Sequence, residues 1–264
     1  VARLRIMRVA LTHAAVHAAL RRRCEILQRA ADELRKSPAF RELLAVVLQI
    51  GNFINHGVVE SAEGTVRAFA IESLHVLHSF KKHGISALHC LCLTMRAEDD
   101  EFMQRLRHSL QHVSDASRER IESLEGEVKT FCDDCRFVEN WALHAANRPN
   151  ERAVSELVGV LQSECREASS SIDVAKTAVS AAQAYFSVSR GTATSAPGDL
   201  FCHVSAFLRQ FQVCWLEVSS GRGRWAQFAA IVARRQARPL AGPKTPREGA
   251  PRYVGPQRRS RSAA

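Results

Sequence analysis

The sequence predicts an all-α protein: an elongated helical bundle that contains a long antiparallel helical hairpin and ends in a disordered basic tail. Apolar residues recur at steps of three and four over most of the first 235 residues, and the period-two alternation of strands is absent. Five of the eight prolines lie beyond residue 238, so few helix breakers interrupt the earlier part. The hydrophobic fraction of 46% is ordinary for a chain with a packed core.

Two consecutive helices are predicted at the start of the chain. The first covers residues 4–36, with one apolar face: Leu4, Met7, Leu11, Cys24, Leu27, Ala31 and Leu34. Ser37 and Pro38 then have the character of a helix N-cap and first helical position, because the hydroxyl accepts a free N–H and proline has none to satisfy. The second helix runs to about Ile54 and is apolar nearly all round, so we expect it to be buried on most sides.

The middle of the chain predicts shorter elements and then the hairpin. Residues 56–68 lack a period and form a loop, and two short helices at 69–82 and 85–96 are broken near Gly84. A long helix begins at the acids Asp99, Asp100 and Glu101 and reaches residue 146 with a nearly strict three-four apolar seam. A turn at 147–150 leads to a second long helix over 154–186, which gives an antiparallel hairpin.

The last part divides into a terminal helix and a tail. A polar loop at 189–198 precedes a helix that starts after Pro197 and persists to about Arg235. We therefore divide the chain into a folded domain, 1–235, and a disordered tail rich in Pro, Gly and Arg, 236–264. The net charge of +10 resides near this end, since residues 219–264 carry eleven basic residues and one acidic residue. Such an arm either meets an acidic partner by salt-sensitive attraction or is a solvated terminus, and the second interpretation is favoured.

No constellation predicts catalysis, a metal or a cofactor. Cys132 and Cys135 form the one CxxC, without the second ligand pair that a zinc site needs, so they are interpreted as ordinary helix residues. The pairs His13/His17 and His108/His112 have metal-clamp spacing but lack a third ligand. Phosphate-binding and nucleophile-elbow motifs are absent from the sequence. We expect a protein that is not an enzyme.

The most informative stretch is LLAVVLQIGNFINHG, residues 43–57. Gly51 lies in an otherwise strong helix at a cost of about 1 kcal/mol relative to Ala, which makes sense where another backbone or an aromatic ring packs closely. Asn52 and Asn55 add amide groups that need partners. The stretch is interpreted either as a docking surface or as a helix C-terminus with Asn55 or Gly57 in the left-handed cap conformation.

At this point the chain resembles the formin homology-two domains. ELRKSPAFRELLAVVLQIGNFINHG, residues 33–57, is similar to the family's pattern ELR-S-x-x-F-x-x-LL-x-x-VL-x-x-GN-[YF]-[MI]-N-x-G. Ser114-Asp-Ala-Ser117 with LEGEVKTF resembles the family's long helix, and Tyr185-Phe186 with DLFCHVSAFLRQF resembles its terminal helix. Arg3-Leu-x-x-Met7 is similar to the segment before the ELR helix. The order and spacing agree over about residues 3–235.

The resemblance implies an actin-binding module that is cytoplasmic and associated with the cytoskeleton. In that family two subunits form a ring, in which the N-terminal lasso of one subunit encircles the post of the other. The ring nucleates actin filaments and stays on the growing barbed end. The glycine-asparagine motif receives the lasso, so the resemblance implies these dimer contacts: Gly51, Asn52, Phe53, Ile54, Asn55 and Gly57.

Two departures from the family pattern shape the expectation. The chain begins inside the family domain, so we expect a post half that lacks the lasso, most of the knob and the proline-rich segment that binds profilin, and that is inactive alone. The family's basic-Asp-Thr sequence aligns with His78, Ser79 and Phe80, which leaves Lys81 and Lys82 as the candidate actin contacts. Two alternatives stay open: a helical-hairpin scaffold whose polybasic tail binds nucleic acid or anionic membrane, and a formin relic that no longer touches actin.

Overall fold

The computed structural model describes residues 2–56, 68–82, 84–144, 151–186, 199–220 and 225. Within these ranges the chain forms nine α-helices, one 3-10 turn and one small hairpin of strands. The elements, in order, are α1 (Ala2–Lys36), α2 (Pro38–His56), the 3-10 turn η1 (Ile71–His75), α3 (Val76–Ser79), β1 (Lys81–Lys82), β2 (Ile85–Ser86), α4 (Ala87–Glu98), α5 (Phe102–Ser109), α6 (Val113–Ala116), α7 (Ile121–Leu143), α8 (Glu151–Tyr185) and α9 (Asp199–Ser219).

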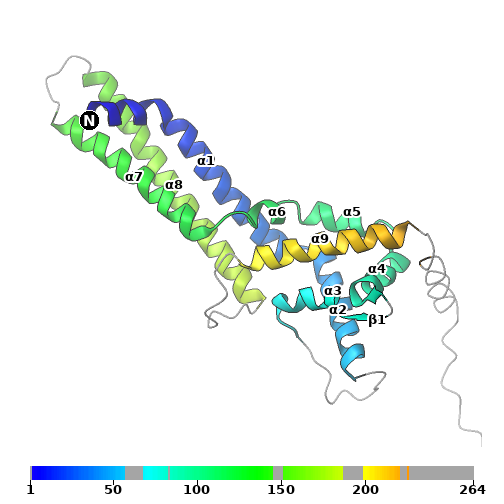
Figure 1. The fold of residues 1–264 in the computed structure, drawn as a ribbon. Coiled ribbons are helices and arrows are strands. Elements are labelled where there is room, and N and C mark those ends of the chain that lie inside the picture. Colours follow the sequence, from blue (N-terminus) through cyan, green and yellow to red (C-terminus); the bar gives the residue numbers. More distant parts are fainter. Residues whose placement is uncertain are drawn as a thin grey trace, which may run out of the picture.

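The all-α class and the elongated shape are confirmed (Figure 1). Helices α1, α7 and α8 lie side by side in a long bundle at one end, and α9 with α2 to α5 forms the other end. The hairpin of α7 and α8 exists as predicted, but α8 packs most extensively on α1. The predicted turn at 147–150 and the tail at 236–264 lie outside the described residues.

Ion pairs tie α1 to α7 and to the segment that precedes α7. Arg23 of α1 contacts Glu119, 2.8 Å away, and also Glu127 of α7. These two carboxylates hold the pKa of Arg23 above its usual value, with the Glu127 hydrogen bond as the largest cause. Arg5 and Arg8 both contact Asp134. Below these pairs the interface is apolar, because Leu27, Ala31, Leu124, Phe131, Leu161 and Ala168 are buried.

The apolar face predicted for the start of α1 is wrong at its first three positions. Leu4, Met7 and Leu11 are 71%, 59% and 82% exposed, whereas Cys24, Leu27, Ala31 and Leu34 are buried as expected. The helical period is right throughout α1, but period alone does not reveal where a neighbouring helix is available to cover the face.

The junction between α1 and α2 has the predicted cap. The Phe40 backbone N–H donates to the Ser37 hydroxyl oxygen at 3.0 Å, which satisfies one free donor at the start of α2. The Ser37 hydroxyl in turn donates to the Ser109 hydroxyl at 2.9 Å, and that hydroxyl donates to the Leu106 carbonyl. Ser37 is buried, so a short chain of hydrogen bonds connects the cap to α5.

The predicted single helix over 99–146 is wrong. The segment forms three helices, α5, α6 and α7, with breaks at residues 110–112 and 117–120. At the second break the Ser117 hydroxyl donates to the Ser114 carbonyl, which offers the backbone a local alternative to helix. The apolar seam nevertheless continues across both breaks, because Leu106, Val113, Ala116, Ile121 and Leu124 are all buried.

The predicted short helix at 69–82 is also wrong at its C-terminal end. Residues 71–79 form η1 and α3, but Lys81 and Lys82 form β1, which pairs antiparallel with β2. Gly84 turns the chain with a φ of 77°, a left-handed conformation that favours glycine. The predicted break near Gly84 is therefore confirmed, and α4 follows it as expected.

Candidate functional site

The last two turns of α2 carry the predicted docking residues on an exposed surface. Figure 1 shows this end of α2 at the lower edge of the view, away from the long bundle. Gly51 and Asn52 are half-buried, whereas Phe53 and Ile54 are 60% and 38% exposed and Asn55 is exposed. The expectation that α2 is buried on most sides is therefore wrong here, although Phe40, Leu43 and Val47 are buried.

Gly51 stands beside open space. A Cβ built on Gly51 meets no atom within 4 Å, so nothing in the described part of the chain explains the glycine by close packing. The residue still costs about 1 kcal/mol of helix stability relative to alanine. Ile54 lies one turn beyond Gly51 on the same side of the helix, and Phe53 is exposed on another side, so this end of α2 offers apolar side chains to solvent.

The helix-cap interpretation of the same stretch is wrong for Asn55. Asn55 lies inside α2, one residue before its end, and is not the left-handed cap. Gly57 lies outside the described residues. Asn52 makes a contact of its own and is not a free amide.

Lys81 and Lys82 lie on a different element from the docking residues. Lys81 pairs with Ser86, and Lys82 with Ile85, in the β1–β2 hairpin. The Lys81 side chain is exposed. Burial raises the pKa of the Cys214 thiol on α9, and the Lys81 charge acts in the opposite direction. The structure thus places Lys81 at an exposed position in the β1–β2 hairpin.

Two exposed apolar residues near this hairpin were missed by the sequence reasoning. Val76 and Phe80 are 50% and 52% exposed. Phe80 directly precedes Lys81, and its carbonyl accepts the Ala87 backbone N–H at 3.0 Å, which holds the hairpin against the start of α4. The helical pattern assigned to 69–82 concealed them, because it predicted one continuous helix, whereas Val76 begins the short helix α3 and Phe80 follows its end.

The described residues contain no group of three His, Cys, Asp or Glu side chains able to hold a metal ion. His13 faces Glu164 at 2.8 Å, and His112 pairs with Glu33, so both histidines serve helix–helix contacts. Cys132 and Cys135 are buried on α7, and burial raises the pKa of Cys135 to about 12. In the described segments, no helix has the length and apolar character needed to cross a bilayer.

The candidate site is thus the exposed, partly apolar end of α2 on a helical scaffold. The match to known proteins agrees with that class: the family model described as Formin Homology 2 Domain matches residues 1–212. The chain belongs to this family.

Individual relatives cover a smaller part of the chain. Disheveled-associated activator of morphogenesis 2 of Mus musculus is 31% identical over 136 residues, which is 49% of this chain and 12% of that protein. Cell division control protein 12 of Schizosaccharomyces pombe is 34% identical over 117 residues, 44% of this chain and 6% of that protein. Putative formin-like protein 15b of Arabidopsis thaliana is 26% identical over 104 residues, 39% of this chain and 28% of that protein. The chain thus spans only a small fraction of these relatives' length.

Proposed function

We propose that this chain is the post half of a formin homology-two module and takes part in actin assembly. In the proposed assembly two full-length subunits form a ring that nucleates filaments and stays on the barbed end, in the cytoplasm and at the cytoskeleton. The partner's N-terminal lasso binds the end of α2 at Gly51–Asn55, together with Gly57. The module works by binding and makes or breaks no covalent bond, and profilin binds only a proline-rich segment outside this sequence.

The observation that carries the proposal is the unfilled surface at the end of α2. Gly51 leaves open space, and Phe53 and Ile54 expose apolar side chains on a helix whose earlier turns are buried. A large exposed aromatic side chain is the kind of feature that dominates protein–protein binding energy, because its burial removes apolar area from water. Lys81, on its exposed hairpin, supplies the positive charge proposed to meet acidic actin.

A binding measurement tests the docking surface. Residues 1–264 are titrated against a fluorescein-labelled peptide that carries a formin lasso, and fluorescence anisotropy gives the affinity. Phe53→Ala should weaken binding at least about 30-fold, the effect of losing an interface hot spot of roughly 2 kcal/mol. Leu143→Ala removes an equally exposed apolar residue from α7 and should change nothing. Equal affinity of both variants and the parent chain would refute the assignment.

Actin assays test the other two parts. In a pyrene-actin assay residues 1–264 alone should not accelerate assembly, because one half of the ring is insufficient; robust acceleration would contradict the proposed inactivity. The double variant Lys81→Glu, Lys82→Glu should weaken co-sedimentation with filaments at low salt. The double variant Arg118→Glu, Lys129→Glu is the matched control, since it makes the same change in net charge at two exposed positions. Identical sedimentation of the two variants would refute the proposal that the hairpin contacts actin.

A further inference from the structure

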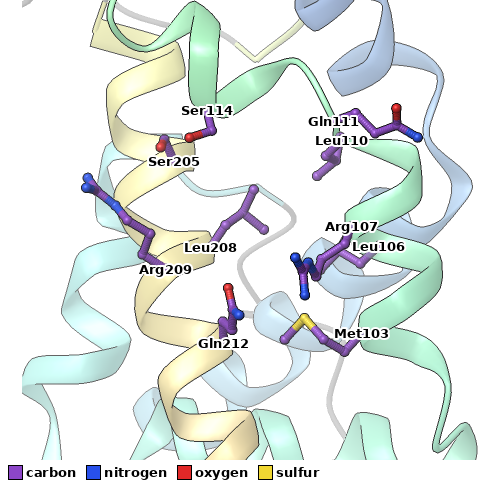
Figure 2. A pocket seen from close by; sticks show the side chains of 10 residues that line it. All are labelled: Met103, Leu106, Arg107, Leu110, Gln111, Ser114, Ser205, Leu208, Arg209 and Gln212. Carbon is purple, nitrogen blue, oxygen red and sulfur yellow. The ribbon is translucent and has the colours of Figure 1, made fainter.

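A groove of about 400 Å³ separates α5 from α9 (Figure 2). It exists because α5 meets α9 near one end of the groove and a different helix meets α9 near the other. At one end Phe102 of α5 packs edge-on against Phe211 of α9, with ring centroids 6.5 Å apart. At the other end the short helix α6 packs on α9, while the middle of α5 rests against α2 instead. The groove is thus a consequence of the break that separates α5 from α6.

The inner surface of the groove is apolar and its edges are basic. Figure 2 shows Met103, Leu110 and Leu208 between the two helices. Arg107 on α5 and Gln212 on α9 extend toward one another across the opening, whereas the Arg209 side chain extends from α9 on the side away from α5. The residues that line the groove include no carboxylate.

The two arginines differ from their neighbours in having no acidic partner. Arg105, two residues before Arg107, pairs with both Asp99 and Glu42. Within the described part of the chain, neither Arg107 nor Arg209 makes an ion pair or a hydrogen bond of its side chain. An apolar channel with two uncompensated positive charges therefore complements a ligand that presents apolar and acidic groups together.

We propose that the α5–α9 groove binds a short amphipathic helix of another protein, one that carries glutamate or aspartate beside its apolar residues. A groove between two helices is a known receptor for such a helix, whose apolar side chains anchor at positions i, i+3 or i+4 and i+7. A volume of about 400 Å³ accommodates a few large side chains and not a whole folded element. One acidic group would face Arg107 at the opening, and another, beyond the edge of the groove, would reach Arg209 on the outer side of α9.

Charge decides between this occupant and the chain's own tail. Residues 219–264 carry eleven basic residues against one acidic residue, so the two groove arginines repel that segment. The groove shares no residue with the end of α2 or with the β1–β2 hairpin. The inference therefore goes beyond the proposed function and does not rest on it.

Methionine methyl NMR offers a direct test, since the chain has three methionines in distinct environments. Met103 lines the groove, Met95 is fully buried in α4 and Met7 is exposed on α1. The full chain, labelled with ¹³C at the methionine methyl groups, is titrated with a 14-residue helical peptide of leucine and glutamate on an alanine background. Its twin has lysine in place of every glutamate. The acidic peptide should shift the Met103 signal and leave those of Met95 and Met7 unchanged.

Charge reversal then tests the role of the arginines. Arg107→Glu and Arg209→Glu should each weaken the acidic peptide roughly fivefold and strengthen its lysine twin. Arg22→Glu is the control, because Arg22 is an exposed arginine on α1 outside the groove. A shift of Met7 instead of Met103, equal binding of the two peptides, or equal affinity of the groove variants and Arg22→Glu would each overturn the proposal.

Discussion

Replacement of Gly51 separates the stability of α2 from its proposed docking role. Gly51→Ala should raise the free energy of unfolding, because alanine restricts the unfolded chain and its Cβ meets nothing within 4 Å in the folded one. The helix-propensity difference is about 0.8–1 kcal/mol in a helix interior. Gly51 lies five residues before the end of α2, where helices fray, so we expect about 0.5–1 kcal/mol.

Urea unfolding followed by circular dichroism measures this gain. For a chain of this size a slope of about 2.5 kcal/mol per molar urea converts it into a midpoint shift of about 0.2–0.4 M. Gly159→Ala is the matched control, since Gly159 lies within α8 and its Cβ position is equally open. Both variants should gain stability by similar amounts.

A larger side chain at position 51 tests the docking role, because it should block binding of the lasso peptide. Gly51→Leu keeps good helix propensity but fills the open space, so it should remain folded and lose affinity for the lasso peptide. Gly159→Leu should bind like the parent chain. Destabilisation by Gly51→Ala would refute the statement that the space is empty, and full affinity of Gly51→Leu would refute the docking role of Gly51.

The remaining predictions concern a helix cap, the buried thiols and a carboxylate at a helix start. Ser37→Ala should cost about 1–2 kcal/mol in urea unfolding, because a buried cap is lost; a change under 0.3 kcal/mol would contradict its role. In native-state alkylation with iodoacetamide at pH 8, mass spectrometry should find Cys202 modified well before Cys24, since burial raises the pKa of Cys24 to about 11 while Cys202 is exposed. Equal rates would show that α1 opens readily. The Asp99 carboxylate accepts the Glu101 backbone N–H, and this hydrogen bond lowers the pKa of Asp99. The ionised carboxylate therefore stabilises the fold above its unfolded pKa, and this stability is lost as the pH falls through its folded pKa. Asp99→Asn should therefore lose less stability between pH 5 and pH 2 than the parent chain does. Identical profiles would show that Asp99 does not contribute to the pH dependence of stability.

The long helices were predictable because each carries its own evidence. In α1, α8 and α9 the three-four spacing continues for five or more turns, and Ser37 and Pro38 mark a boundary by their chemistry. The breaks between α5, α6 and α7 were not predictable, since the apolar seam continues through them and the serine hydroxyls that stabilise the turns are common on helix surfaces. Strands of two residues such as β1 are too short to show any period.

The sequence did not predict which helices pack on each other, for a different reason. Periodicity identifies which face of a helix is apolar, but a face does not specify its neighbour, so the extensive contact of α8 with α1 was missed. The same limit applies to the candidate site. Gly51 within a strong helix indicated an unusual surface. The exposure of Phe53 could not be predicted, because it depends on whether a neighbouring element covers that residue. The α5–α9 groove follows from the unpredicted break and had no sequence signal.

The one-residue junction at Ser37 has a mechanical consequence. Helices of 35 and 19 residues, about 52 Å and 28 Å long, follow one another with no loop between them. Along the backbone, tension applied at the tip of α2 would reach α1 through Ser37, whose hydroxyl accepts the Phe40 backbone N–H and donates to the Ser109 hydroxyl. We expect α1 and α2 to move as one rigid pair under load. The junction should break by loss of the Ser37 cap and not by gradual bending of either helix.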